Sequence, residues 1–181
     1  MRNAALAILL VLAGCAAGDD TIPPVPPLAG QGTRGPAFNA IEGAAEAFGN
    51  PAALAGRPAE AAVAVSRLEW EAWAIPRERS FYTFSAITAP SLTAARYEVR
   101  QALGIAQDAR PEVVIAAMEG AATALASGDR AAARGALPAP AFAPDTLERL
   151  ASLPRLPQAN QATRRAQRDI EFGRDQDREE R

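Results

Sequence analysis

The sequence predicts an all-α protein, a small bundle of about five to six helices. Over several long segments, apolar residues recur at alternating intervals of three and four, which is the period of an amphipathic helix. No segment beyond residue 15 shows the period-two alternation that is typical of a half-buried strand. Proline and glycine bracket the apolar stretches, as they commonly do at the two ends of a helix.

The first fifteen residues have the layout of a secretory signal. A positive charge at Arg2 precedes the apolar run 4–12, which is much shorter than the roughly 20 residues that a helix needs to span a bilayer. The segment ends in four residues, Leu12, Ala13, Gly14 and Cys15. Cys15 is the single cysteine of the chain, and it directly follows two small residues.

These four residues resemble the lipobox of bacterial lipoproteins. The resemblance implies that Cys15 Sγ receives a diacylglyceryl group, that residues 1–14 are removed, and that the new amine is acylated. Several acyl chains, each contributing about 0.8 kcal/mol per buried CH₂, would anchor the protein on a membrane. The alternative is a buried free cysteine. Ala16 and Ala17, rather than Asp, follow the cysteine, which favours the periplasmic face of the outer membrane over the inner membrane.

Missing residue types exclude several kinds of chemistry. The chain has no histidine, and its 19 basic residues are all arginines. It therefore contains no Ser-His-Asp triad, no imidazole metal ligand, and no lysine for a Schiff base or a P-loop. A lipidated Cys15 leaves no free thiolate. Without Arg2, 18 arginines face 21 acidic residues, so the chain lacks the basic excess of a nucleic-acid-binding protein. We expect no cofactor, no metal and no nucleic acid.

Residues 15–57 comprise the lipidated cysteine and a predicted proline- and glycine-rich tether. Seven of the fifteen prolines lie between residues 16 and 58. Twenty extended residues of this kind reach roughly 60 Å at about 3 Å per residue. Within the tether, four residues have helical spacing and predict a short amphipathic helix that ends at Gly49. They are Phe38, Ile41, Ala45 and Phe48.

The helical domain is predicted to cover residues 58–160, and its clearest helix runs from Pro58 to about Ile75. Pro58 suits the first turn of a helix, and Pro76 ends it. The apolar stripe of this helix consists of Ala61, Val65, Leu68, Ala72 and Ile75. The aromatic residues that follow at 81–84 predict a loop laid against the core.

Four further helices are expected in the second half of this domain. They span residues 91–103, 111–126, 130–137 and 146–153. Gly104 and Gly128 follow the two longer helices as stop signals. Asp129 and Asp145 can cap the two shorter ones.

Residues 161–181 are predicted to form a charged C-terminal tail. The last 18 residues contain six arginines and six acidic residues, with few apolar ones. A helix held by local ion pairs and a disordered tail both fit this composition.

Two pairs of side chains are candidates for a ligand or partner surface. Trp70 and Trp73 lie three residues apart on the clearest helix, where their rings can form a platform for a sugar or an arginine-stacked ligand. Two large anchors in a small alanine-rich core, with solvated charges such as Glu69 and Glu71 nearby, give the same pattern, and we prefer this interpretation. Arg96 and Arg100 have i,i+4 spacing and can grip one anion. A solvated helix face paired with nearby acids is the preferred alternative.

The missing catalytic chemistry and the tether favour a non-enzymatic envelope lipoprotein of unknown biochemical activity. Such a protein is an adaptor or structural module, held on the membrane by the lipid on Cys15 and docked on an envelope protein. The alternative is a module that binds a small ligand or peptidoglycan, or a glycan hydrolase with two carboxylates about 5 to 9.5 Å apart. No residue is nominated as catalytic. In composition and layout, the chain resembles small alanine- and arginine-rich lipoproteins of unknown function from GC-rich Gram-negative bacteria, a resemblance that assigns no site.

Overall fold

The structure is a computed structural model that describes residues 24–179. Within this range the chain forms seven α-helices and two short 3₁₀-helices, with no strand. The prediction of a small all-α bundle is therefore confirmed. The predicted signal segment and the lipidated Cys15 lie outside the described residues.

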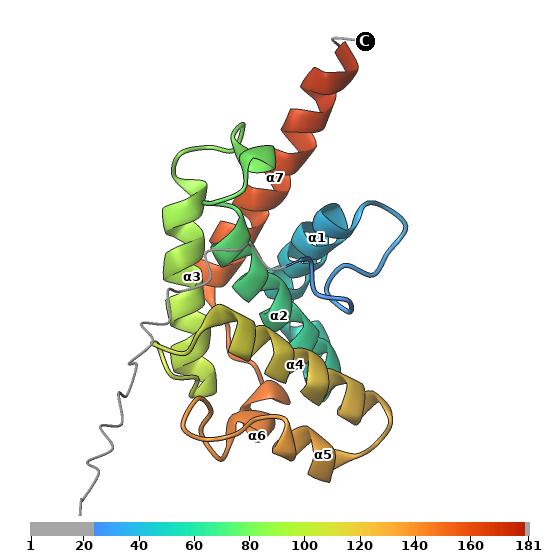
Figure 1. The fold of residues 1–181 in the computed structure, drawn as a ribbon, viewed down its shortest axis with the longest axis vertical. Coiled ribbons are helices and arrows are strands. Elements are labelled where there is room, and N and C mark those ends of the chain that lie inside the picture. Colours follow the sequence, from blue (N-terminus) through green and yellow to red (C-terminus); the bar gives the residue numbers. More distant parts are fainter. Residues whose placement is uncertain (1–23, 180–181) are drawn as a thin grey trace, which may run out of the picture.

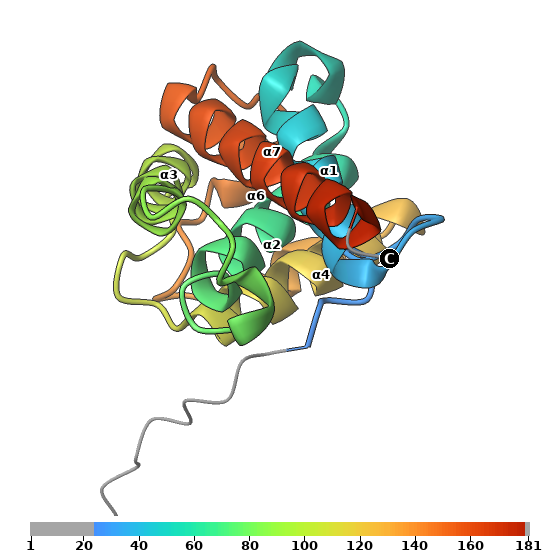
Figure 2. The same ribbon diagram turned by 90° about the horizontal axis from the view of Figure 1, so that it is seen from above.

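The helices follow one another along the chain with short connections (Figure 1). They are α1 (Pro36–Gly49), η1 (Pro51–Leu54), α2 (Pro58–Ala74), η2 (Arg79–Phe81), α3 (Thr88–Leu103), α4 (Pro111–Ala126), α5 (Arg130–Gly135), α6 (Thr146–Leu150) and α7 (Pro157–Glu179). Helix α2 lies in the middle and contacts α1, α3, α4 and α6. Helix α7 packs along α1 and α3, as the view from above shows (Figure 2). No helix among residues 24–179 combines the length and the apolar character that a membrane span requires.

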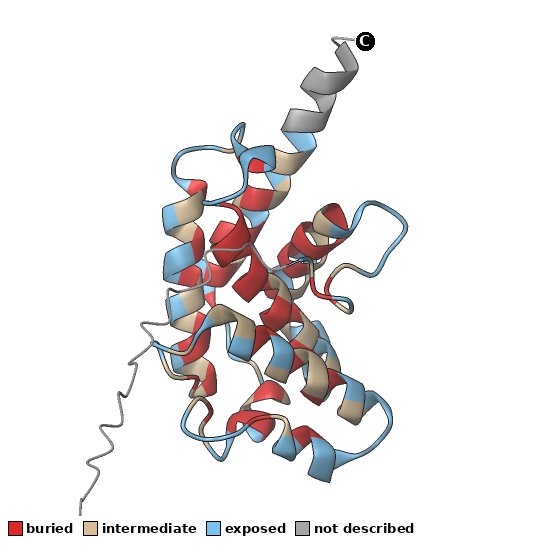
Figure 3. Cartoon of the chain, viewed as in Figure 1, coloured by how far each residue is buried: buried red, intermediate tan, exposed pale blue. Residues whose placement is uncertain are grey.

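Helix α2 is the central helix of the core. Of its 17 residues, 12 are buried, which is far more than the single stripe of a surface helix (Figure 3). Pro58 occupies its first turn, as predicted. Because neighbouring helices cover α2 on several sides, polar side chains outside the predicted stripe are buried too, among them Glu69 and Glu71.

The helical body begins well before residue 58. The predicted helix between Phe38 and Phe48 is formed as α1, but it belongs to the core and not to a tether. Ile41, Ala44 and Phe48 are buried in the same cluster as the residues of α2, and Phe38 is buried as well. A helix this short is marginal alone, so its apolar face needs the surfaces that α2 and α7 provide.

Most helix ends follow the predicted signals. Gly104 ends α3 in the left-handed conformation, with φ +70°, and Asp129 caps α5 by accepting a hydrogen bond from the Ala132 N–H at 2.8 Å. The prediction for Asp145 was wrong, because its carboxylate accepts a hydrogen bond from Arg149 Nε at 2.9 Å and caps no backbone group. Helix α6 ends at Leu150 and is therefore shorter than the predicted helix over residues 146–153.

The predicted charged tail starts inside the core. Pro157 begins α7, and three alanines that repeat every three or four residues are buried against the bundle. They are Ala159, Ala162 and Ala166. Further along, Asp169 accepts hydrogen bonds from the Thr88 hydroxyl at 2.5 Å and the Ser85 N–H at 3.2 Å. Small side chains that allow close helix contact, and not local ion pairs, therefore hold this part of the helix in place.

The aromatic segment after α2 covers the core as predicted. Phe81 is buried, and its ring centroid lies 6.1 Å from that of Trp70 and 5.1 Å from that of Phe84. Both contacts are edge-to-face, an arrangement that aromatic pairs prefer. Tyr82 points outward and is 85% exposed.

Candidate functional site

The two tryptophans are core anchors. Trp70 is 1% exposed and Trp73 is 7% exposed. The guanidinium of Arg77 lies over the Trp73 ring, 5.2 Å from its centroid, and covers what remains accessible. Neither ring offers an open platform for a sugar, so both tryptophans are anchors of the core, as preferred. The expectation of solvated charges beside them was wrong for Glu69 and Glu71, which are buried because other helices cover α2 on several sides.

Arg100 is equally buried, and each of its three guanidinium nitrogens donates a hydrogen bond within the protein. Its Nε and Nη2 atoms each lie 2.7 Å from a carboxylate oxygen of Glu69, in a bidentate pair. Its Nη1 atom donates to the carbonyl oxygens of Ala106, Gln107 and Ala109 at 2.8 to 3.2 Å. Arg100 thus links α3 to α2, and its hydrogen bonds also hold the loop that connects α3 with α4.

Arg96 does not converge with Arg100 on an open site. It is partly buried, and burial lowers the pKa of its guanidinium while the Glu69 carboxylate opposes that shift. Burial also raises the pKa of Glu69, against the effect of Arg100. Trp70, Trp73 and Arg100 are buried, so the four candidate residues form no open ligand surface. The preferred alternative for the arginine pair, a solvated helix face, is wrong as well, because Arg100 is 1% exposed.

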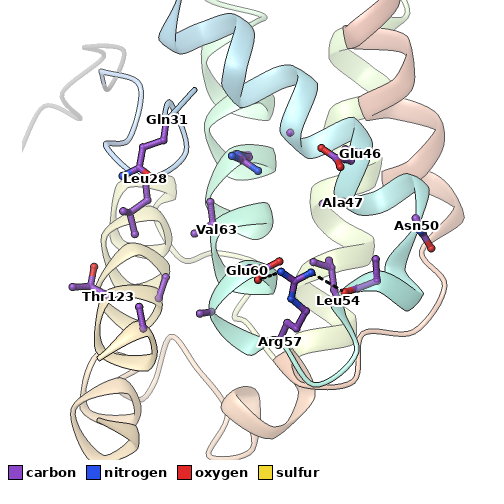
Figure 4. A pocket seen from close by; sticks show the side chains of 16 residues that line it. Leu28, Gln31, Glu46, Ala47, Asn50, Leu54, Arg57, Glu60, Val63 and Thr123 are labelled. Carbon is purple, nitrogen blue, oxygen red and sulfur yellow. Dashed lines mark hydrogen bonds and ion pairs between the residues drawn. The ribbon is translucent and has the colours of Figure 1, made fainter. Parts of the chain in front are cut away.

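A groove of about 650 Å³ opens elsewhere, between α1, η1, α2 and α4 (Figure 4). This volume lies within the range of about 300 to 1,000 Å³ that is common for ligand sites. Its apolar walls are formed by Leu28, Ala47, Leu54, Val63, Ala122 and Ala126. No aromatic side chain lines it among the described residues. A groove with such walls favours apolar groups of moderate size.

Arg67 of α2 supplies a cation to this groove. Its Nε donates to the Ala29 carbonyl oxygen at 3.1 Å, whereas its Nη atoms form no hydrogen bond or ion pair with any described residue. The guanidinium lies directly on Gly43, where a Cβ would come within 2.4 Å of Arg67 Cζ. The absence of a side chain at Gly43 therefore lets the guanidinium fit between α1 and α2.

Three carboxylates act on Arg67 from a distance. Burial lowers the pKa of the Arg67 guanidinium, and Glu71, Glu46 and Glu119 oppose that shift in this order of strength. Glu71 lies one helical turn further along α2, is 0% exposed, and accepts no hydrogen bond from any described residue at either oxygen. Burial raises its pKa well above the ordinary value, so the neutral form is favoured.

Glu119 of α4 is fully occupied in holding the chain before α1. Its two carboxylate oxygens accept the N–H groups of Leu28 and Ala29, both at 2.9 Å, and Oε1 also accepts the Ser66 hydroxyl at 3.3 Å. With the bond from Arg67 to Ala29, these contacts fasten residues 28–31, which we call the latch. Leu28 and Gln31 of the latch line one side of the groove.

The remaining charges lie at the rim of the groove. Glu46 follows Gly43 by one turn of α1, is exposed, and forms no ion pair or side-chain hydrogen bond with a described residue (Figure 4). Arg57 and Glu60 line the groove too, but they form an ion pair with each other. The unpaired charges of the groove are therefore the Arg67 cation and the Glu46 anion.

Sequence reasoning missed this groove. One signal pointed to it, namely Gly43 inside a helical pattern, because a lone glycine there often marks a close approach between segments. Arg67 itself is one of 19 arginines and carries no distinguishing pattern. No group of three or more carboxylate, cysteine or histidine side chains with the geometry of a metal site occurs in the described part of the chain.

Comparisons with known proteins give no relative for this chain. No family model matches it, and neither a curated protein nor a solved structure shows significant similarity.

Proposed function

We propose that this protein is a lipid-anchored, non-enzymatic binding module of the cell envelope, and that the groove between α1, α2 and α4 is its binding site. The observation that carries the proposal is the Arg67 guanidinium. It is held in an apolar groove by one hydrogen bond, and its Nη atoms have no partner among the described residues. Buried charges are ordinarily paired, so a partly buried cation without a partner among the described residues favours a ligand that supplies one.

The latch limits how far a lipid anchor on Cys15 could hold the groove from the membrane. Cys15 precedes Leu28 by 13 positions, and an extended chain of that length spans at most about 45 Å. Leu28 is itself part of the groove wall. A lipid on Cys15 would therefore keep the groove closer to the membrane surface than the 60 Å that the tether composition alone suggests.

The anchor is tested with the Cys15→Ser variant. We expect the wild-type protein to carry the mass of a diacylglyceryl group and to sediment with membranes, and the variant to do neither. Intact mass spectrometry and membrane fractionation measure both properties. An unmodified wild-type cysteine would overturn the anchoring part of the proposal.

The groove is tested with a neutral apolar dye, Nile red, whose fluorescence rises in an apolar site. Ala126 is exposed and lines the groove at the end of α4, so Ala126→Trp places a bulky ring inside it. Ala131 is exposed on α5 and does not line the groove, which makes Ala131→Trp the matched control. We expect Ala126→Trp alone to abolish the dye signal. Equal signals from both variants would overturn the binding site.

A further inference from the structure

We infer that the ligand of this groove is a small zwitterion with apolar side chains, an apolar amino acid or dipeptide, whose carboxylate pairs with Arg67 and whose ammonium group pairs with Glu46. The inference rests on the proposed function, since it names the ligand class of the same groove.

The carboxylate is assigned to Arg67 because no carboxylate of the described residues forms an ion pair with its guanidinium. Glu119 already accepts three hydrogen bonds, from the latch and from Ser66. Glu71 is fully buried and does not line the groove. The Nε atom of Arg67 is bound to Ala29, which leaves the Nη atoms as donors for an incoming anion. Planar guanidinium groups bind carboxylates in this way with good geometry.

The ammonium group is assigned to Glu46 from its place on α1. Glu46 stands one turn beyond Gly43, the residue on which the Arg67 guanidinium lies, and both charged side chains line the groove. The two are near enough for Glu46 to raise the pKa of Arg67, yet they form no direct ion pair. A short backbone that carries both an ammonium and a carboxylate group can bridge this gap.

Two other ligand classes fit less well. A simple fatty acid would satisfy Arg67 but would bring its carboxylate close to Glu46, and like charges at short range repel. A sugar ligand is commonly stacked on an aromatic ring, and none lines this groove among the described residues. The second cation at the rim, Arg57, is already paired with Glu60 and adds no further attraction for an anion.

The walls indicate which side chains the zwitterion carries. The walls consist of small alanines and the larger Leu28, Leu54 and Val63, and they enclose a groove of about 650 Å³. Apolar surface of this kind gains free energy when it buries aliphatic groups. Leucine side chains, alone or in a dipeptide, match both the volume and the chemistry of the walls.

The experiment measures the binding of four probes to the purified full chain by isothermal titration calorimetry. The probes are leucyl-leucine, its C-terminal amide, its N-acetylated form, and free leucine. We expect amidation to weaken binding to the wild type about tenfold or more, because it removes a charge-assisted pair with a partly buried group. Acetylation should weaken binding about threefold, since Glu46 is exposed. Free leucine binding as tightly as the dipeptide would support an amino acid as the ligand, and weaker binding of leucine would support a peptide.

Two protein variants test which side chain binds each charged group of the ligand, in the manner of a double-mutant cycle with one change on the protein and one on the ligand. In Arg67→Gln, the dipeptide and its amide should bind equally, and in Glu46→Gln the dipeptide and its acetylated form should bind equally. Arg134→Gln is the matched control, because it removes an exposed cation that is already paired and does not line the groove. It should preserve both differences. The comparison of probes on the wild type remains informative even if Arg67→Gln does not fold.

Failure of the inference and failure of the proposed function give different results. If Nile red reports the groove but all forms of the dipeptide bind equally or none binds, the zwitterion assignment is overturned and the binding site stands. Dodecanoate is titrated as a fifth probe, and if it binds more tightly than leucyl-leucine, the zwitterion assignment is likewise overturned in favour of an anionic lipid. If Ala126→Trp also leaves the dye signal unchanged, both proposals are overturned.

Discussion

The guanidinium of Arg100 and the carboxylate of Glu69 form a bidentate pair inside the core, with both N···O distances at 2.7 Å. The two side chains are 2% and 1% exposed. They come from α3 and α2, and Arg100 also binds three carbonyl oxygens of the following loop. A single side chain thus joins two helices and a connection.

Removal of Arg100 should strongly destabilise the fold, because it leaves the Glu69 carboxylate buried without a counter-charge. We expect Arg100→Met to lower the free energy of unfolding by about 3 to 5 kcal/mol. Urea denaturation followed by circular dichroism measures the loss. The matched control is Arg134→Met, which breaks an exposed pair with Glu148 and should cost less than about 1 kcal/mol.

The double variant Glu69→Gln with Arg100→Met should regain part of that loss, because it removes both charges together. An additive effect of the two substitutions would contradict the coupling between these side chains.

The buried carboxyl of Glu71 should make stability depend on pH. Its pKa is raised in the folded state, so the folded protein binds a proton more tightly than the unfolded chain does. Stability is then greatest below the unfolded value of about 4.3 and falls as the pH rises from there towards the folded pKa. The slope contributed by one such group is at most about 1.4 kcal/mol per pH unit.

Glu71→Gln should remove this part of the slope and make the protein more stable at neutral pH. Glu69, whose pKa is also raised, keeps its own contribution in both proteins. Urea denaturation of the two proteins between pH 4 and pH 8 measures the difference. Parallel stability curves would show that Glu71 does not titrate differently in the folded state.

The latch should loosen when Glu119 loses its charge. Glu119→Gln weakens the hydrogen bonds to the N–H groups of Leu28 and Ala29, and hydrogen bonds to charged groups contribute about 1.5 to 3 kcal/mol. We expect faster amide hydrogen exchange at these two residues, with little change at the centre of α2. Unchanged exchange rates would mean that the bond from Arg67 to Ala29 holds the latch by itself.

The helices could be predicted from the sequence because the residues that indicate a helix and its ends lie close together in the chain. Helix periodicity, Gly104 after α3 and Asp129 before α5 act within a few residues. The extent of the core was harder to predict. The apolar stripe of α1 indicates that one face of the helix is buried, but it does not show which helices pack against that face. The alanines of α7 lie in a charged segment and by themselves predict neither burial nor exposure. They are buried because α7 packs closely against α1 and α3.

The candidate site depends on contacts between residues that are distant in the sequence. Glu119 lies 91 residues from Leu28, and Ala29 lies 38 residues from Arg67. A single sequence offers no way to pair them, and the same holds for Arg100 and Glu69, which are 31 residues apart. Each of these charged residues is indistinguishable from the solvated charges around it until the helices are brought together.

Gly43 should be essential for the position of Arg67 but not for the stability of α1. A Cβ at residue 43 would come within 2.4 Å of Arg67 Cζ, and the end of a flexible side chain can move away from it. Alanine is favoured over glycine within a helix by about 1 kcal/mol, which offsets the cost of that movement. We expect Gly43→Ala to change the free energy of unfolding by less than about 1 kcal/mol and to weaken leucyl-leucine binding about tenfold.

Gly120→Ala is the matched control, because this glycine also lies inside a helix, α4. Its Cβ would meet Ala136 at 3.5 Å, an ordinary van der Waals contact, so the variant should be more stable by up to about 1 kcal/mol and should bind the dipeptide normally. Urea denaturation and calorimetry measure the two properties separately. If Gly43→Ala bound the dipeptide as tightly as Gly120→Ala does, the position of the guanidinium on Gly43 would have no part in ligand binding.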